Sequence, residues 1–524
     1  MSAQLKVSDR YDAIVVGSGM AGSLMAAKLS AEGLRVLIVE AGPERTLKEL
    51  YSSQIWARKL KWRGTPVEES GDHRIEHVFN AGYGTGGSAI HHYGVWLRLH
   101  ENDFNVASEH GMGLDWPINY GDLRPYYDEI QHEIGISGDA KAEKWRPAGD
   151  PYPLPPLPLF PQGQTLKKAF TAAGRHTAPL PVAINTRPRN GRAACSYDGW
   201  CDAGCPTGAL ANPLATYLPV ALANGAQLIH DAEVIRVLRD ASNAAKVTGV
   251  EYIYAGERRR AMASKVVLCA FPVQNARILH NSADDRLVAP GNEHDQLGRY
   301  LMTHPAGTVF GLFEDDTAPH QGVSAGALLC HDHYADKQAI KGAFGSYQWL
   351  IAQAAKPNDL LGYGTSRPDI YGAALEPFLT KAASHLANMT MVGEDIPQAK
   401  NRIVLSDNKD PNGVPVAHAS HDTSAQTVAL WDHAMAEGRQ IMSQGGAIET
   451  WQGPRVAMHI LGGTVMAKDP QRSVTDEYGR VHSMENLYVA GSGLFPSGGA
   501  VNPTFTLSAL ALRTARHIVS AAAG

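Results

Sequence analysis

The amino-acid sequence predicts an α/β fold in which a domain built on a parallel sheet is interleaved with a second domain. Three observations support this prediction. A short apolar strand near the N-terminus, 11–16, runs into a glycine-rich turn and a helix. A second strand and glycine loop, 487–502, leads into an amphipathic helix more than 450 residues later. Between them, β-branched stretches at 234–238, 247–253 and 263–270 predict a meander of three strands attached to the first sheet.

The N-terminal turn carries a glycine motif in a specific context. Gly17, Gly19 and Gly22 form G-x-G-x-x-G between a strand and a helix, and a second strand ends at Glu40. This order is the Rossmann fingerprint for a dinucleotide. Gly17 makes the tight turn, Gly19 and the neighbouring Ser18 let the backbone approach a pyrophosphate, and Gly22 allows close helix–strand packing. Glu40 lies 18 residues after Gly22, where its carboxylate can accept hydrogen bonds from ribose hydroxyls.

The C-terminal glycine loop favours FAD over NAD. Gly491 and Ser492 follow a buried strand, and Pro503 stands at the first helical position, where its missing N–H costs nothing. A loop this poor in side chains brings backbone close to a ligand, and a helix start offers free N–H groups to an anion. FAD lies extended and needs its flavin end held separately. We therefore predict that the segment from Gly491 to Thr504 holds the flavin.

Composition limits the class of protein. With 524 residues, 44% of them hydrophobic, the chain can bury a large core and is expected to form two connected domains. A net charge of −5 indicates no nucleic-acid partner. No run approaches the roughly 20 apolar residues of a membrane span, and residues 1–10 carry no export signal. Seven prolines within 147–161 predict an extended surface loop.

Several segments together match one known family. They are the N-terminal fingerprint with Glu40-Ala-Gly-Pro43, the C-terminal block, Gly84-Thr-Gly-Gly-Ser88, Asn102-Asp-Phe104, Asp115-Trp-Pro117, Tyr126-Tyr127 and Gly298-Arg-Tyr-Leu-Met-Thr-His-Pro305. Through them the chain resembles the glucose–methanol–choline (GMC) flavoprotein oxidoreductases over nearly its full length. It is most similar to the branch of bacterial membrane-associated, FAD-dependent sugar dehydrogenase catalytic subunits.

The resemblance implies contacts with FAD. The turn at Gly86 and Gly87, followed by Ser88, packs on the pyrophosphate in such proteins, and residues near Val234 lie against adenine. His91 matches a position at which some relatives attach FAD covalently through histidine. We predict non-covalent contact at this histidine.

The resemblance also implies a catalytic pair that faces flavin N5. His459, in Met458-His-Ile-Leu-Gly-Gly-Thr-Val-Met466, matches the base, and Asn502 matches its partner. Oxidising an alcohol removes the hydroxyl proton while a hydride leaves carbon for flavin N5, so a neutral imidazole within hydrogen-bond reach lowers the barrier. Asn502 would orient the hydroxyl without competing for the proton. A lone histidine is more often part of a core, and the surrounding motif favours the catalytic role.

Three of the five cysteines lie close together in the sequence. Cys195, Cys201 and Cys205 form C-x5-C-x3-C in a loop with glycine and proline. They could converge on one iron–sulfur cluster, or form a disulfide and leave a spare thiol. Zinc would usually need a fourth ligand, and none is evident in this loop. The sugar dehydrogenase branch carries a 3Fe–4S cluster on cysteines of this spacing, so the resemblance favours the cluster. Cys269, in an apolar strand, is predicted to be an inert core thiol.

These observations predict an FAD-dependent dehydrogenase that oxidises a hydroxyl of a sugar or related polyol. His459 would act as base, and electrons would leave through the cluster to a cytochrome or quinone. One alternative is an oxidase or non-sugar alcohol dehydrogenase of the same fold without a cluster. Another is a lyase or non-redox flavoprotein, which the pair His459 and Asn502 argues against. We interpret His331-Asp-His333 as a solvated loop rather than a metal site.

The resemblance implies partners and a location as well. Relatives are exported together with a small chaperone-like subunit that carries the signal, and they pass electrons to a cytochrome c subunit. This would place the protein at the periplasmic face of the inner membrane, with cytoplasmic residence as the alternative.

The predicted domains are discontinuous. Residues 1–105, 206–310 and 470–524 form the FAD-binding domain, 106–205 a lid that contains the cysteine loop, and 311–469 a substrate-binding domain with a mixed sheet.

Overall fold

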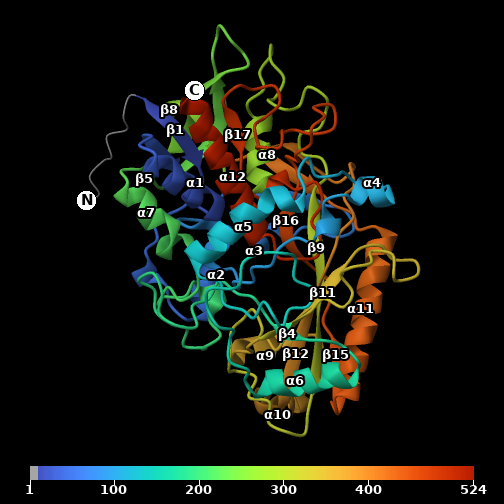
Figure 1. Ribbon diagram of the computed structural model, residues 1–524. Coiled ribbons are helices and arrows are strands. Elements are labelled where there is room, and N and C mark those ends of the chain that lie inside the picture. The colour runs from blue at the N-terminus through green and yellow to red at the C-terminus, as the bar shows by residue number, and fades with distance from the viewer. Residues whose placement is uncertain (1–9, 524) are drawn as a thin grey trace.

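The computed structural model describes residues 10–523, whose strands form three sheets. Two seven-stranded sheets are the centres of two lobes, and helices cover both (Figure 1). Across this described range no helix combines the length and apolar character that crossing a membrane requires. The prediction that the N-terminus lacks an export signal concerns residues 1–9 above all, which lie outside the described residues.

The first sheet brings the two glycine loops to one edge. Its strands are β1 (Tyr11–Val16), β2 (Val36–Val39), β5 (Gln227–Ile229), β6 (Ala232–Arg239), β7 (Val247–Tyr254), β8 (Glu257–Leu268) and β17 (Leu487–Val489). Their order is β5-β2-β1-β8-β7-β6, with β17 paired to β8. Because β1 and β17 both run parallel to the second half of β8, the loops that follow them emerge together. The first half of β8 pairs antiparallel with β7, which completes the predicted meander.

The helices of this lobe include the two that the sequence predicts, one after the N-terminal glycine turn and one at the C-terminus. They are α1 (Met20–Ala31), α5 (Tyr120–Ile134), α7 (Tyr217–Ala223), α8 (Pro272–His280) and α12 (Thr504–Ala523). Helix α1 packs against α7 and α12, and Figure 1 shows α1 and α12, from opposite ends of the chain, side by side. Pro503 immediately precedes α12 and its carbonyl accepts from the amide of Leu507, as expected at a helix start.

The second sheet is the core of the other lobe. Its strands are β4 (Ala178–Pro179), β9 (Met302–Leu312), β10 (Leu328–Cys330), β11 (Tyr347–Ile351), β12 (Leu386–Gly393), β15 (Glu449–Gln452) and β16 (Val456–Leu461). Their order is β15-β9-β12-β11-β10-β4, with β16 paired to β9. The sheet was expected to be mixed, and all its pairings are antiparallel. Strand β9 crosses the boundary predicted at residue 310, and β4 comes from the predicted lid.

Helices cover this second sheet on its outer side (Figure 1). Helix α11 packs against β9 and β12, and α6 packs against α11. The helices are α6 (Pro161–Ala172), α9 (Pro357–Gly364), α10 (Leu375–His385) and α11 (Ala425–Gln444). A third sheet, in the order β13-β14-β3, and three short helices complete the structure: β3 (Val67–Ser70), β13 (Arg402–Lys409), β14 (Pro415–Ser420), α2 (Gln54–Lys59), α3 (His77–Asn80) and α4 (Val106–His110).

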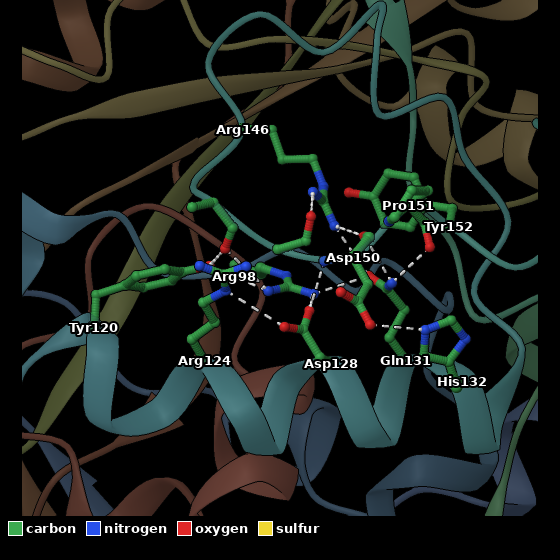
Figure 2. A network of polar contacts seen from close by, with 12 residues as sticks. Arg98, Tyr120, Arg124, Asp128, Gln131, His132, Arg146, Asp150, Pro151 and Tyr152 are labelled. Carbon is green, nitrogen blue, oxygen red and sulfur yellow. Dashed lines mark hydrogen bonds and ion pairs between the residues drawn. The ribbon is translucent and has the colours of Figure 1, made fainter.

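A polar network anchors the proline-rich segment to α5 (Figure 2). The buried Arg98 guanidinium donates to Asp128 Oδ1 at 2.6 Å and to Gln131 Oε1 at 3.0 Å. The amide of Gln131 donates in turn to the carbonyl of Asp150 at 2.9 Å. Between Pro151 and Phe160 the chain is irregular, which confirms the predicted loop, and α6 begins at Pro161.

Candidate active site

The N-terminal turn is shaped by close backbone packing. Gly17 has a φ of +97°, and a Cβ there would lie 2.7 Å from the carbonyl oxygen of Cys269, the residue that follows the neighbouring strand β8. A Cβ at Gly22 would lie 2.0 Å from the carbonyl oxygen of Gly17. At Gly19 the nearest atom to a Cβ would be 4.0 Å away, so this glycine faces open space. The tight turn and the close helix packing are therefore as the fingerprint predicts. Ligand contact at Gly19 stays a prediction.

Glu40 ties this turn to the neighbouring loops. Its Oε2 accepts from the amide and the hydroxyl of Ser18 at 2.9 and 2.7 Å, and its Oε1 accepts from the amide of Gly42 at 2.9 Å. The amide of Gly86 donates to the Ser18 hydroxyl at 3.0 Å, which brings the two glycine turns into contact. Each carboxylate oxygen can accept two hydrogen bonds, so Oε1 retains one position for a ribose hydroxyl.

One continuous cavity extends from this turn to the C-terminal glycine loop. Gly22 and Gly86 do not line the cavity, and a Cβ at Gly86 would contact the side chain of Ile90. All the other predicted cofactor residues line the cavity: Gly17, Ser18, Gly19, Glu40, Gly87, Ser88, His91, Val234, Gly491, Ser492, Asn502, Pro503 and Thr504. His459 lines it as well. The structure thus brings residues from both ends of the sequence into one cavity, and their contacts with FAD stay a prediction.

His459 is held in a strained backbone conformation. It lies on β16 where the pairing with β9 shifts register between Met458 and Leu461, and its φ is +57°. Such an angle is costly for a residue with a Cβ and persists only where neighbouring groups hold it. Asn80 supplies one such contact, because its side-chain oxygen accepts from the His459 amide at 3.1 Å. The bulge turns the imidazole into the cavity.

A second histidine, His304, contacts His459 directly. It lies on β9 opposite Met458, is fully buried, and places its Nδ1 2.8 Å from Nδ1 of His459. Its Nε2 lies 3.4 Å from the carbonyl oxygen of Gly498. Burial lowers the pKa of His304 to about 4. Burial, and then the His304 imidazole, hold the pKa of His459 well below its ordinary value, so both rings are neutral near pH 7.

Asn502 contacts the other nitrogen of His459. Its Nδ2 donates to His459 Nε2 at 3.2 Å, and its Oδ1 accepts from Gln348 Nε2 at 3.1 Å. The predicted pair is therefore brought together. The sequence reasoning assigned no role to His304 or Gln348. A signal for His304 exists, because it is the histidine of the Gly298–Pro305 segment; none exists for Gln348.

Comparison with known proteins decides the family. Two family models, both described as GMC oxidoreductase, match residues 11–306 and 397–511. The chain belongs to the GMC oxidoreductase family. It is therefore an enzyme, an oxidoreductase acting on CH–OH groups of alcohols or sugars, and FAD is its cofactor.

Relatives of this GMC oxidoreductase match almost end to end. It is 30% identical to 2-methyl-1,2-propanediol dehydrogenase of Mycolicibacterium austroafricanum, over 98% of this chain and 95% of the relative. It is 28% identical to the fructose dehydrogenase large subunit of Gluconobacter japonicus, over 97% of this chain and 98% of the relative. The crystal structure of pyridoxine 4-oxidase from Mesorbium loti superposes with a TM-score of 0.66 at 17% identity, covering 97% and 98% of the two chains. This last likeness confirms the predicted fold class.

His91 lies in the cavity wall of the GMC oxidoreductase with one nitrogen engaged. Its Nδ1 lies 2.9 Å from the ammonium of Lys61, and its buried Nε2 has no protein partner. Burial lowers the pKa of Lys61 to about 8. Since an ammonium can only donate, Nδ1 is the acceptor, and the proton of the neutral imidazole lies on Nε2.

The cysteine loop lies close to the cavity but does not line it. All five cysteines are free, so the alternative of a disulfide is not what the structure shows. Cys195 Sγ accepts from the amide of Tyr197 and Cys205 Sγ from that of Leu210, both at 3.3 Å. Within residues 10–523, no three His, Cys, Asp or Glu side chains converge tightly enough to hold a metal ion. The cluster on Cys195, Cys201 and Cys205 therefore stays a prediction.

The sequence predicts a solvated loop at His331-Asp-His333; the segment is a loop, but the prediction that its histidines are solvated is wrong. His331 is only 2% exposed, and its Nε2 lies 3.0 Å from Oε1 of Gln348. His333 Nε2 lies 2.8 Å from a carboxylate oxygen of Glu437. The residues of this segment are polar, which favours a solvated loop, but aromatic rings from other segments cover it.

Proposed function

We propose that this GMC oxidoreductase is an FAD-dependent dehydrogenase that oxidises a hydroxyl group of a sugar or related polyol. The observation that carries the proposal is the arrangement of His459 and Asn502, whose polar atoms meet in the cavity that also contains the dinucleotide fingerprint. The names of two relatives support the substrate class, because one refers to a diol and the other to a sugar.

The proton acceptor in this proposal is Nε2 of His459. A carbonyl oxygen can only accept, so the neutral His304 ring carries its proton on Nε2 toward Gly498 and accepts at Nδ1. His459 must then donate from Nδ1 to His304, which leaves a lone pair on His459 Nε2. Backbone geometry thus selects the tautomer that a general base needs.

Asn502 orients the substrate hydroxyl toward this lone pair. When bound, FAD supplies a hydride acceptor at flavin N5. A hydroxyl that enters between Asn502 and His459 can accept from Asn502 Nδ2 and donate to His459 Nε2, replacing the hydrogen bond that joins them in the free protein. His459 then holds the hydroxyl proton at Nε2 while Asn502 stabilises the negative charge that grows on the oxygen.

We also propose a 3Fe–4S cluster on Cys195, Cys201 and Cys205, which would supply one-electron transfer toward a cytochrome or quinone. Two observations support it. Backbone amides that donate to the sulfurs of Cys195 and Cys205 suit charged thiolate ligands. A Cβ at Gly204, between two of the cysteines, would lie 3.1 Å from Ile90, the neighbour of His91, so the loop is close to the cavity wall.

The partners follow from the same proposal. The relative from Gluconobacter japonicus is by name a large subunit, which supports an assembly with further chains. We propose a small chaperone-like subunit that carries the export signal, a cytochrome c subunit, and a position at the periplasmic face of the inner membrane.

Flavin reduction tests the proposed reaction. Anaerobic mixing of the purified protein with a panel of sugars and polyols should bleach the flavin absorbance. The His459→Ala variant should bind FAD and lose at least about a hundredfold in the rate of bleaching, the usual contribution of a general base. Normal bleaching in that variant would remove His459 as the base.

A second measurement separates the proposal with a cluster from the alternative without one. Iron, acid-labile sulfide and the EPR spectrum of anaerobically purified protein should report one 3Fe–4S cluster per chain. Flavin without iron would reject the cluster and favour an oxidase or an alcohol dehydrogenase that passes electrons directly from flavin.

A further inference from the structure

The hydrogen bonds on either side of His459 all run in one direction. They join His331 to Gln348, Gln348 to Asn502, Asn502 to His459, His459 to His304, and His304 to the carbonyl of Gly498. Because the last acceptor cannot donate, each group back along the chain must donate toward it. Asn502 therefore points its Nδ2 at His459, and Gln348 points its Nε2 at Asn502 Oδ1.

Gln348 is rigidly held at the far side of Asn502. It lies on β11, is fully buried, and receives on Oε1 a hydrogen bond from Nε2 of His331 at 3.0 Å. The ring of His331 is stacked against Tyr334, with ring centres 4.8 Å apart, and is flanked by His100 and Trp145. Burial lowers the pKa of His331 to about 3, so the ring is neutral and its Nε2–H can serve as the donor.

We infer that Gln348, oriented by His331, is a positioning residue that sets the amide of Asn502 with its N–H group toward the substrate oxygen. This inference rests on the proposed roles of His459 and Asn502. The carbonyl oxygen and the NH2 group of a side-chain amide are similar in size, so the amide can be placed either way round. Only the NH2 group can donate to a hydroxyl oxygen whose own proton goes to His459. The alternative orientation would present a carbonyl oxygen to the lone pair of His459 Nε2.

The isosteric variant Gln348→Glu reverses the polarity of this contact. An ionised carboxylate accepts only, so Asn502 would turn its Nδ2 toward the carboxylate and its Oδ1 toward His459. His459 would then have to protonate Nε2, and the base would be lost. A protonated carboxyl group still carries one donor and can replace the glutamine amide opposite Asn502 Oδ1. The variant should therefore work when the carboxyl is protonated and fail when it is ionised.

The groups around position 348 bear on that titration. His331 is in direct contact, His100 lies beyond it, and the charges of Asp103 and Asp332 reach His331. Burial raises the pKa of an isolated carboxyl group, whereas a hydrogen bond from the His331 ring favours its ionised form. These groups change the pH at which the carboxyl group of Gln348→Glu ionises, but in every case it loses its proton as the pH rises. The rate of the variant relative to the wild type should therefore fall with rising pH.

The experiment measures the limiting rate of anaerobic flavin reduction from about pH 5 to about pH 9, divided by the wild-type rate at each pH. For Gln348→Glu this ratio should fall by about a hundredfold as the carboxyl ionises, with little change in the substrate concentration at half-saturation. Methionine cannot donate and buries no charge. The rate of Gln348→Met should therefore be about tenfold lower than the wild-type rate at every pH, because one orienting hydrogen bond is lost. FAD content should be unchanged in both.

Gln162→Glu is the matched control. Gln162 on α6 is 1% exposed and bonds to the carbonyl of Gln353 and the amide of Asn388, with no contact to the catalytic pair. Its ratio should stay near one at every pH. Wild-type rates in Gln348→Met would overturn the inference, because methionine cannot orient Asn502. Failure of the proposed function would look different, as the absence of flavin reduction by any sugar or polyol in the wild-type protein.

Discussion

Replacing His304 with leucine tests whether its hydrogen bond with His459 Nδ1 fixes the tautomer of His459. The change removes the only partner described for His459 Nδ1, which lies 2.8 Å from His304 Nδ1. Leucine is close to histidine in size, and the site is fully buried, so the cavity wall should keep its shape. The tautomer that carries its proton on Nδ1, and leaves Nε2 free to accept, would then have an unpaired buried N–H.

The cost can be worked from that lost contact. A buried donor without a partner costs about 1–3 kcal/mol, and each 1.4 kcal/mol changes a population about tenfold. The base-competent tautomer should therefore become about fivefold to about 150-fold less populated. Since the proposed reaction needs this tautomer, the limiting rate of flavin reduction should fall by the same factor. Over most of this range the loss is smaller than the loss of about a hundredfold or more expected for His459→Ala, because the proposed base is still present.

Anaerobic stopped-flow reduction of the flavin measures this rate, and the flavin absorbance reports whether FAD remains bound. His304→Asn provides a matched control, because its side-chain oxygen can accept from His459 Nδ1 in place of the ring nitrogen. It should stay within about threefold of the wild-type rate. A His304→Leu variant that binds FAD and reduces it within about twofold of the wild type would refute the reasoning.

Three further outcomes are expected. Acid denaturation should release all flavin into the supernatant, because His91 accepts from Lys61 at Nδ1 and so has no lone pair on Nε2 with which to bond FAD; flavin in the pellet would contradict this. Lys337→Met should lower the free energy of unfolding in urea by about 3–5 kcal/mol, because it leaves buried Asp103 and Glu394 without their cation at 2.8 and 2.6 Å. The exposed pair made by Lys400 provides the control, and Lys400→Met should cost less than about 1 kcal/mol; equal losses would contradict the expectation. Finally, the melting temperature should fall as the pH drops from about 6.5 to about 4, and a constant value would be the contrary result. Five buried histidines have their pKa lowered by burial to about 3 or 4, so in this window the unfolded chain binds protons that the folded one does not: His77, His92, His100, His304 and His331.

The cofactor end of the site was predictable because its signals are local. A glycine at position 17 is needed for the turn and one at position 22 for helix packing, and both requirements follow from the order strand, glycines, helix. The same holds for the C-terminal loop, whose glycines precede a helix that begins after Pro503. Each of these features is contained within about a dozen residues, so strand pairing does not have to be known.

The groups behind the proposed catalytic pair depend on strand pairing instead. His304 meets His459 because β9 and β16 pair with His304 opposite Met458 and because a bulge follows. A shift of one residue would turn His304 to the other face of the sheet. Gln348 likewise reaches Asn502 only through the register of β11 with its neighbours. No pattern within a single segment encodes such a contact.

The domain boundaries and the cysteine cluster are only partly predictable from local sequence signals. Spacing shows that Cys195, Cys201 and Cys205 lie in one loop, but convergence depends on the path of the backbone between them. That path includes positive φ angles at Tyr197 and Cys205, which a sequence pattern does not specify. The domain boundaries at 105, 205, 310 and 469 stay a proposal, although β9 continues through the third of them.

The direction of the hydrogen bonds through His304 and His459 depends on one position in the glycine loop, Gly498. A Cβ at Gly498 would lie 2.7 Å from Leu461 Cδ1 and 3.0 Å from His304 Nε2. A side chain there would push the imidazole away from the carbonyl that fixes its tautomer, and the lone pair on His459 Nε2 would no longer be assured. The expectation that a bare loop brings backbone close to a ligand is therefore incomplete. At Gly498 the group that the backbone approaches is a histidine of the protein itself, so in the proposed mechanism the bare loop would serve the base as well as the cofactor.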